Sequence, residues 1–107
     1  MARPRLRLHD ILTELMESED ISGKQVYFQP PASLRMQYPC IRYKLDDTDT
    51  IFADNNPYVR NKRYEVVVID PDPDSRIPDK ISNLPMCLFD RHYTSDNLNH
   101  FVFKIYY

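Results

Sequence analysis

The most apolar stretch of the chain constrains its fold more than any other segment. Residues 64–69 read Tyr-Glu-Val-Val-Val-Ile, with three valines and an isoleucine in succession. β-Branched residues favour strands, and a strand that lacks polar alternation is typical of one buried on both faces. We therefore expect a central strand here.

Two helices are predicted on either side of this strand in the sequence. One set of apolar residues recurs at the spacing of a single helical stripe: Leu8, Ile11, Leu12, Leu15 and Met16. This stripe predicts a helix over residues 6–19, followed by Gly23, where a chain leaving a helix needs backbone freedom. A second helix is expected to start at an N-cap on Asp74 or Ser75 and to end at Pro85.

The remaining apolar segments predict further strands at residues 26–28, 40–45, 51–53, 86–93 and 99–107. The strand at 40–45 alternates between a dry face and a wet face, on which Arg42 and Lys44 lie. Residues 46–50 and 54–57 are predicted to be polar turns. This order predicts an α+β fold in one domain over residues 1–107, with both helices packed on a mostly antiparallel sheet of about five to six strands.

Charge and hydropathy argue against several classes of partner. The formal net charge of −2 argues against a nucleic-acid binder that gains affinity by neutralising phosphates. No apolar run approaches the ~18 residues of a membrane span. Arg3, Asp10 and Glu14 interrupt the apolar runs of the N-terminus, which argues against a signal peptide. We expect no specific nucleic-acid partner, no membrane partner, and synthesis in a cytoplasm.

Residues able to carry out catalysis or bind cofactors are sparse. A single Gly rules out the glycine-rich loops that cradle phosphates or dinucleotides. Cys40 and Cys87 lack the spacing of zinc ligands, so free thiols are expected. His92 and His100 fall where a closing hairpin, with Asp96 and Asn97 in its turn, could place them face to face, which is more often a structural pair than a metal site. We expect no enzyme activity, no cofactor and no metal.

An acidic segment is the one part of the chain that suggests a catalytic function instead. Asp70, Asp72 and Asp74 follow the apolar strand in a pattern that resembles the start of phosphatase-like haloacid dehalogenases, in which a carboxylate attacks phosphorus. Pro71 and Pro73 stiffen this loop, and the later motifs of such enzymes need a far longer chain. A capped turn is the stronger interpretation, and a small metal-dependent phosphohydrolase remains an alternative of a different class.

The eight tyrosines allow two interpretations. Tyrosine is enriched in buried protein interfaces, so a Tyr-rich chain with few other apolar residues suits a subunit that completes its burial in an assembly. Tyrosines also cap strand ends with their hydroxyl groups in water. Composition alone does not decide between these two interpretations.

A set of turn and strand signatures carries a family resemblance. They are Tyr38-Pro39-Cys40-Ile41-Arg42-Tyr43, Ala53-Asp54-Asn55, Arg63-Tyr64-Glu65-Val66, Asp72-Pro73-Asp74-Ser75, and Phe89-Asp90-Arg91-His92-Tyr93 with Asp96-Asn97-Leu98-Asn99-His100. Over residues 38–107 the chain resembles small neck and tail-completion proteins of tailed bacteriophages, among them the tail terminators. The resemblance implies a virion protein forming a hexameric ring that caps the tail tube, ends tube growth and joins the tail to the head connector. A head-closure or connector subunit of the neck is the nearest alternative.

If the resemblance holds, each subunit of a head-to-tail ring uses two different surfaces. The implied partners are further copies of the chain, the tail tube protein and head-closure or connector proteins, in the tail or neck of a virion assembled in the host cytoplasm. The candidate interface residues come from the loop at 46–50, the segment at 58–62 and the acidic loop: Asp47, Asp49, Tyr58, Arg60, Lys62, Asp70, Asp72 and Asp74.

Overall fold

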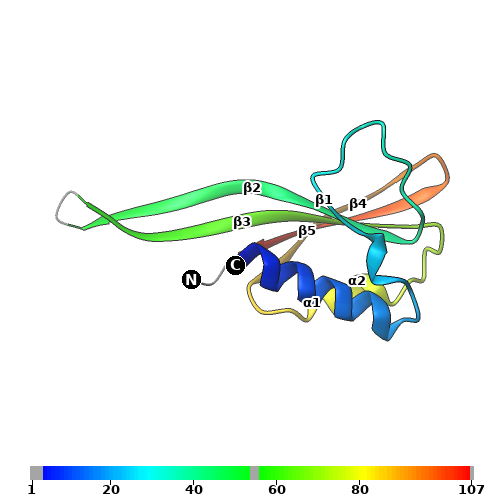
Figure 1. The fold of residues 1–107 in the computed structure, drawn as a ribbon. Helices are drawn as coiled ribbons and strands as arrows, with labels where there is room; N and C mark the ends of the chain where they lie inside the picture. The colour runs from blue at the N-terminus through cyan, green and yellow to red at the C-terminus, as the bar shows by residue number, and fades with distance from the viewer. Residues whose placement is uncertain (1–3, 54–55, 107) are drawn as a thin grey trace.

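The computed structural model describes residues 4–53 and 56–106, and describes Pro4 and residues 47–61 by their backbone alone. The chain forms a five-stranded sheet with two helices on one face (Figure 1). In chain order the elements are α1 (Pro4–Ser18), the 3-10 helix η1 (Gly23–Gln25), β1 (Val26–Phe28), β2 (Cys40–Ala53), β3 (Asn56–Asp70), α2 (Ile77–Ser82), β4 (Cys87–Ser95) and β5 (Leu98–Tyr106). The α+β fold predicted from the sequence is confirmed.

The sheet has the strand order β1-β2-β3-β5-β4. The β1–β2 pair is parallel, and the other three pairs are antiparallel. The predicted central strand lies in β3, between β2 and β5, and five of its side chains are buried: Tyr64, Val66, Val67, Val68 and Ile69. The expectation of a strand buried on both faces is therefore confirmed.

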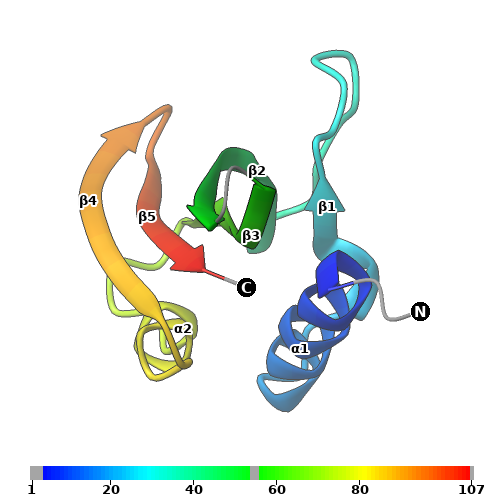
Figure 2. The ribbon, with the colours of Figure 1, turned by 90° about the vertical axis from the view of Figure 1, so that its left-hand side faces the viewer.

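Each face of the sheet has its own apolar cluster. The larger one lies under the helices, where Leu12 of α1 and Ile81 of α2 are fully buried against β2, β3 and β5. The smaller one lies on the opposite face and contains Cys40, Val67, Ile69 and Val102, with Met36 packed against it. Figure 2 shows both helices beneath the sheet, and the residue 29–39 loop and the β4–β5 hairpin rising on the other side. The sheet face between them is therefore concave.

A long hairpin replaces the turns that were predicted between residues 46 and 62. Residues 46–50 lie in β2, so the turn expected there is wrong, and the candidate segment at 58–62 lies in β3. We call residues 47–53 and 56–62 the arm. In the part of the chain that the structure describes, its strands pair with each other alone, because β1 pairs no further along β2 than Tyr43 and β5 pairs no further along β3 than Arg63. Figure 1 shows the arm projecting from the body of the domain.

The polar residues of this segment explain the wrong prediction, because Asp, Asn and Thr favour turns. Residues 46–50 lack the apolar alternation that identifies a half-buried strand. The predicted break at 54–57 is also wrong for its last two residues. Asn56 and Pro57 belong to β3, and residues 54 and 55 lie outside the described residues.

The helix boundaries differ from the predictions by a few residues. The second helix has Arg76 at its N-cap position without a side-chain cap, so the predicted cap on Asp74 or Ser75 is wrong. The hydroxyl group of Ser75 still accepts a hydrogen bond from the backbone N–H of Ile77, the first residue of the helix, at 3.3 Å. The helix ends at Ser82, before the proline that was expected to end it.

The single glycine is needed for space, since its backbone φ is not positive. A Cβ atom on Gly23 would lie 2.5 Å from Cγ2 of Thr13 on α1. Asp20, with φ of 60°, takes the left-handed conformation that was expected of the glycine after the helix. A side chain at position 23 would push η1 away from α1.

The closing hairpin turns at Asp96 and Asn97 as predicted, and the turn is limited to these two residues, which both have positive φ, at 52° and 62°. Asp and Asn tolerate this conformation, and turns of this kind match the twist of the strands. The expected histidine pair is wrong. His92 lies opposite Phe101 while His100 lies opposite Tyr93, so the two imidazoles are on opposite faces of the hairpin.

Candidate interaction surfaces

The acidic loop after β3 is a capped turn. Oδ1 of Asp70 accepts the backbone N–H of Asp72 at 2.8 Å, and Oδ1 of Asp72 accepts that of Asp74 at 2.9 Å. The Asn99 amide donates to the carbonyl oxygens of Asp70 and Pro71, both at 3.3 Å. Among the side chains that the structure describes, in residues 5–46 and 62–106, no three of His, Cys, Asp or Glu are placed to hold a metal ion.

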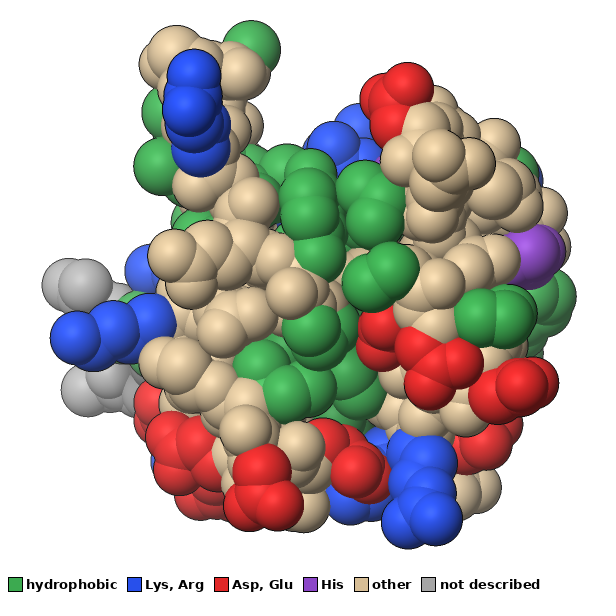
Figure 3. Space-filling model, turned by 90° about the vertical axis from the view of Figure 1, so that its right-hand side faces the viewer, with side chains coloured by type: hydrophobic (Ala, Val, Ile, Leu, Met, Phe, Trp, Pro, Cys, Tyr) green, Lys and Arg blue, Asp and Glu red, His purple; other side chains and the backbone are tan. Residues whose placement is uncertain are grey.

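Asp72 and Asp74 are nevertheless exposed and contribute to an acidic surface. With Glu19 at the end of α1 they line a shallow hollow. Figure 3, a view of the end opposite the arm, shows acidic side chains gathered in its lower half. This surface is at the opposite end of β3 from the arm, because the strand runs from Asn56 to Asp70.

The other five candidate residues all belong to the arm. Asp47 and Asp49 lie on β2, and the backbone register puts both positions on one face of that strand. Tyr58, Arg60 and Lys62 lie on β3. Of these side chains only that of Lys62 is among those described, and it is exposed. The sequence analysis took them from a loop at 46–50 and a segment at 58–62, and the structure places both stretches on paired strands.

Ion pairs hold the base of the arm to the sheet. Oδ2 of Asp46 lies 2.8 Å from Nε of Arg63 and 2.9 Å from Nζ of Lys104, which joins β2 to β3 and β5. The hydrogen bond from Lys104, followed by that from Arg63, holds the pKa of Asp46 below its usual value. Sequence reasoning missed this group because it depends on strand order.

A second feature is a groove of about 470 Å³ on the concave face of the sheet. Its lining comes from the residue 29–39 loop and from β2, β3 and β4: Gln29, Pro30, Arg42, Tyr43, Lys44, Leu45, Glu65, Val67, Arg91 and Tyr93. The lining has three cations and one carboxylate, and the carboxylate of Asp90, with Oδ2 2.7 Å from Nη1 of Arg91, leaves one net positive charge there, whereas the whole chain has a net charge of −2. We call it the cationic groove.

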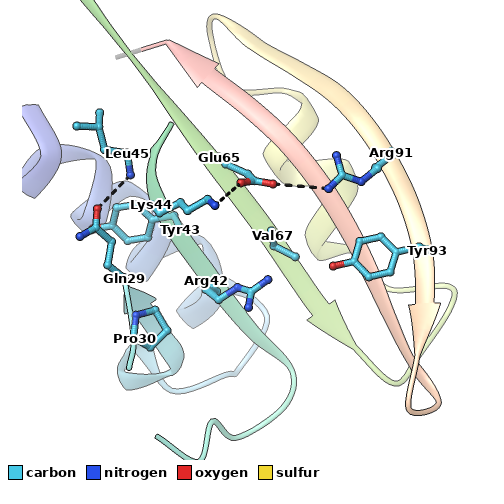
Figure 4. Close-up of a pocket in the computed structure, with 10 residues that line it drawn as sticks. All are labelled: Gln29, Pro30, Arg42, Tyr43, Lys44, Leu45, Glu65, Val67, Arg91 and Tyr93. Atoms are coloured by element: carbon cyan, nitrogen blue, oxygen red, sulfur yellow. Dashed lines mark hydrogen bonds and ion pairs between the residues drawn. The ribbon is translucent and has the colours of Figure 1, made fainter. Parts of the chain in front are cut away.

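The charges in the cationic groove are unevenly paired (Figure 4). Glu65 is shared, with Oε2 3.3 Å from Nζ of Lys44 and Oε1 3.9 Å from Nη2 of Arg91. The side chain of Arg42 makes no hydrogen bond or ion pair with any residue in the described part of the chain. The wet strand face predicted from Arg42 and Lys44 is confirmed, but its other members could not be placed without the sheet order.

The walls of the groove are held in place without a ligand. Gln29 donates its backbone N–H to the carbonyl of Tyr43 at 2.9 Å and accepts the backbone N–H of Leu45 on its side chain at 3.3 Å. On the opposite wall the ring of Tyr93 stacks on His100, with centroids 4.6 Å apart and planes 11° apart. Preorganised walls reduce the entropy lost on binding.

The edge strand β4 exposes apolar side chains. Met86, just before the strand, and Leu88 and Phe89 within it are 57–68% exposed. An unpaired edge with large apolar side chains is a surface on which another chain can pair or pack. It lies beside an apolar hollow of about 350 Å³ that includes Leu8 and Tyr106.

The cysteines are free, and β3 and β5 separate their strands. Burial raises the pKa of Cys40 to about 12 and also raises that of the half-buried Cys87. At pH 8 a thiol of pKa about 12 is thiolate in roughly one molecule in 10,000, against about a quarter for a free cysteine.

We therefore expect Cys40 of a Cys87→Ser variant to react with a disulfide reagent about a thousandfold more slowly when folded than in denaturant. Cys87 of a Cys40→Ala variant should show a smaller difference. The measurement is the rate of thiol labelling at pH 8. Equal rates for Cys40 in the folded and denatured protein would contradict its burial.

Comparison of the chain with known protein families, curated proteins and solved structures gives no match. No helix in the described part of the chain is both long and apolar enough to cross a membrane.

Proposed function

We propose that this protein is a structural subunit of a tailed-phage virion, a tail terminator that assembles into a hexameric ring, ends tail-tube growth and joins the tail to the head connector. It acts by binding copies of itself and the adjoining virion proteins. The proposal starts from the sequence resemblance over residues 38–107, and one structural observation supports it most.

That observation is the arm. Its two strands form a hairpin to which no third strand pairs among the described residues. An isolated two-stranded hairpin is marginal in water. The far half of this one contains the apolar residues Ile51, Phe52 and Val59. Such a hairpin gains stability when another molecule covers it, which is the behaviour of a subunit made for an assembly.

The exposed apolar edge strand supports the same conclusion. Leu88 and Phe89 lie on the edge opposite β1, on the outer strand of the sheet. The arm and this edge are different surfaces, and contacts between two different surfaces of one chain generate rings when the rotation between subunits closes. The tyrosine-rich composition suits burial in such contacts.

Purified protein is expected to form a closed ring, either alone or on contact with tail tubes. Six copies of the 12.8 kDa chain give a particle of about 77 kDa. Light scattering coupled to size exclusion, over a range of protein concentrations, measures this mass. Negative-stain imaging shows whether the particle is annular.

Tail tubes of the same virion, polymerised from their tube protein, provide the second half of the test. The expected result is one ring at the end of each tube and no further growth after it binds. A species that stays monomeric at every concentration, and neither binds tubes nor changes their length, would contradict the proposed function.

A further inference from the structure

We infer that the outer edge of β4 is the docking site for the arm of a second copy of this chain, whose β2 strand adds to β4 as a further strand of the sheet. This inference rests on the proposed function, because it specifies how one subunit of the ring holds the next. The contact is made by the backbone N–H and C=O groups of the two strands.

The strand β4 has a long open edge. It pairs with β5 on one side and, in the part of the chain that the structure describes, with no strand on the other. Every residue of β4 after Cys87 is exposed. Proteins commonly protect such an edge with lysine or proline, and the nine residues of β4 include neither. Its one irregularity is the bulge between Phe89 and Arg91, so most of the edge can accept a further strand.

Apolar side chains flank this edge on both faces of the sheet. Leu88 lies opposite Lys104, and on the other face Phe89 lies opposite Phe103, with the two ring centroids 5.5 Å apart. Leu88 is 60% exposed and Phe89 is 57% exposed. A strand added to β4 covers part of both side chains, so apolar burial adds to the main-chain hydrogen bonds of the new pair.

The arm has the other long open edges of the described chain. Beyond Tyr43 of β2 and Arg63 of β3, each strand of the arm has one side to which no described strand pairs. The open edge of β1 is only three residues long. A hairpin of two strands is marginal in water, whereas three or more strands can be stable. The arm therefore gains stability when it joins the sheet of a neighbour.

Of the two strands of the arm, β2 has the less protected edge. The β3 half of the arm contains Pro57 and Lys62, and lysine and proline are the residues that most often prevent pairing at an edge. Proline also lacks the N–H group that a partner strand needs. Residues 47–53 of β2 contain neither residue type. We therefore assign the contact with β4 to β2.

The arm of the same molecule cannot reach β4. Tyr106 of β5 lies opposite Arg63 at the base of the arm, and Cys87 at the start of β4 lies opposite Ile105, the residue before Tyr106. β4 therefore runs from the base of the arm toward the opposite end of the body, whereas the arm extends away from the body (Figure 1). An arm that adds to β4 comes from another copy.

The lengths of the two strands match. At about 3.3 Å per residue, the seven arm residues of β2 reach roughly 23 Å and the nine residues of β4 roughly 30 Å. The arm strand can therefore pair along its whole length. Because the arm and the edge are different surfaces, each subunit holds the next in a head-to-tail series that can close into a ring.

The turn between β4 and β5 identifies a backbone donor that faces outward. Ser95 and Leu98 flank this two-residue turn, and turns of this kind join their flanking residues by a hydrogen bond. Hydrogen-bonded and non-hydrogen-bonded pairs alternate along an antiparallel ladder. The N–H groups of Thr94 and His92 therefore point away from β5.

A donor on the arm is identified in the same way. The backbone N–H of Leu45 donates to the side chain of Gln29, so it points away from β3. The register of β2 shifts by one residue between Leu45 and Asp47. Counted past this bulge, the alternation directs the N–H of Thr50 to the open side of β2.

Proline substitution at these positions tests the pairing. His92→Pro removes an outward N–H of β4 and no hydrogen bond to β5, and Thr50→Pro does the same for the arm. Each should raise the concentration at which half of the chains are assembled by at least about tenfold, because a carbonyl of the partner strand loses its donor. His92→Ala and Thr50→Ala keep the backbone donor, and these matched controls should assemble as the unmodified chain does. Light scattering against concentration is the measurement.

Mixing the two proline variants tests the occupant. The His92→Pro chain keeps its arm, and the Thr50→Pro chain keeps its β4 edge. At a concentration where each variant alone is monomeric, the mixture should form a one-to-one complex and no larger particle, because the two remaining surfaces are blocked. Circular dichroism and thermal unfolding verify that each variant is folded. Thr94→Pro, which removes the next outward N–H of β4, replaces His92→Pro if that variant does not fold.

Assembly that is unchanged by His92→Pro, or a mixture that forms no complex, would overturn the docking site and leave the ring intact. Dimers of the Thr50→Pro chain alone would show that β4 pairs with β4 of another copy, and dimers of the His92→Pro chain alone would show that the arm pairs with another arm. Either result would overturn the inference. An unmodified chain that never assembles would overturn the ring and the docking site together.

Discussion

Replacing Tyr43 with Ala is expected to lower the free energy of unfolding by about 3–5 kcal/mol, the usual cost of truncating a buried aromatic side chain. Tyr43 is fully buried in the cluster under the helices. Its ring centroid lies 4.9 Å from that of Phe28 and 6.3 Å from that of Tyr64, and its hydroxyl lies 2.7 Å from Nδ1 of His9. Because domains are stable by about 5–15 kcal/mol, this loss is a large fraction of the total.

Urea unfolding followed by circular dichroism measures the change, at a protein concentration where the chain is monomeric. Tyr43→Phe separates the hydroxyl from the ring and should cost about 1 kcal/mol, the typical value of one hydrogen bond. Tyr93→Ala removes a tyrosine that is 37% exposed on the edge strand and should cost less than Tyr43→Ala. Equal losses for Tyr43→Ala and Tyr93→Ala would show that Tyr43 does not lie in the core.

The parts of the fold that could be predicted are those with a local signal. The stripe that includes Leu12 and Met16 has the period of a helix, and both residues are fully buried. The run at 64–69 has the composition of a buried strand and lies at the centre of the sheet. The Asp96-Asn97 turn is encoded by two residue types that tolerate positive φ.

The arm could not be predicted because no single residue signals it. Asp47 and Asp49 have low strand propensity, and a propensity argument places them in a turn. In the structure each is paired across to β3, so the preference of the whole hairpin outweighs that of its members. Propensity at such positions depends on the neighbouring strand, which the sequence does not identify.

Part of the cationic groove could be predicted from the sequence. The alternation around Arg42 and Lys44 predicted a wet face on that strand, and the structure has it. Glu65 stands in a run predicted to be buried, and Arg91 lies far along the chain. They meet Lys44 because β3 separates β2 from β5 and a bulge between Phe89 and Arg91 sets the register of β4. Sheet order of this kind is a long-range property.

Removing the arm is expected to abolish assembly while leaving the domain folded. The change replaces residues 49–61 with Asn-Gly, which joins the paired residues Thr48 and Lys62 by a two-residue hairpin turn. The body should keep its stability, because the arm pairs with itself alone and the ion pairs of Asp46 at its base remain. Light scattering should find only monomers at concentrations where the full chain is assembled, and thermal unfolding should stay cooperative.

The β4–β5 turn provides a control of the same kind, since replacing Asp96 and Asn97 with Asn-Gly rebuilds a hairpin turn without shortening it. That variant should both fold and assemble. A chain without the arm that still forms annular particles would show that the exposed edge strand, with Leu88 and Phe89, joins the subunits by itself. A chain without the arm that unfolds would show instead that the arm belongs to the body, against the strand pairing seen here. Loss of assembly by a chain that stays folded is the expected result. It differs from both of these outcomes, because only the surface that reaches a neighbour has then been removed.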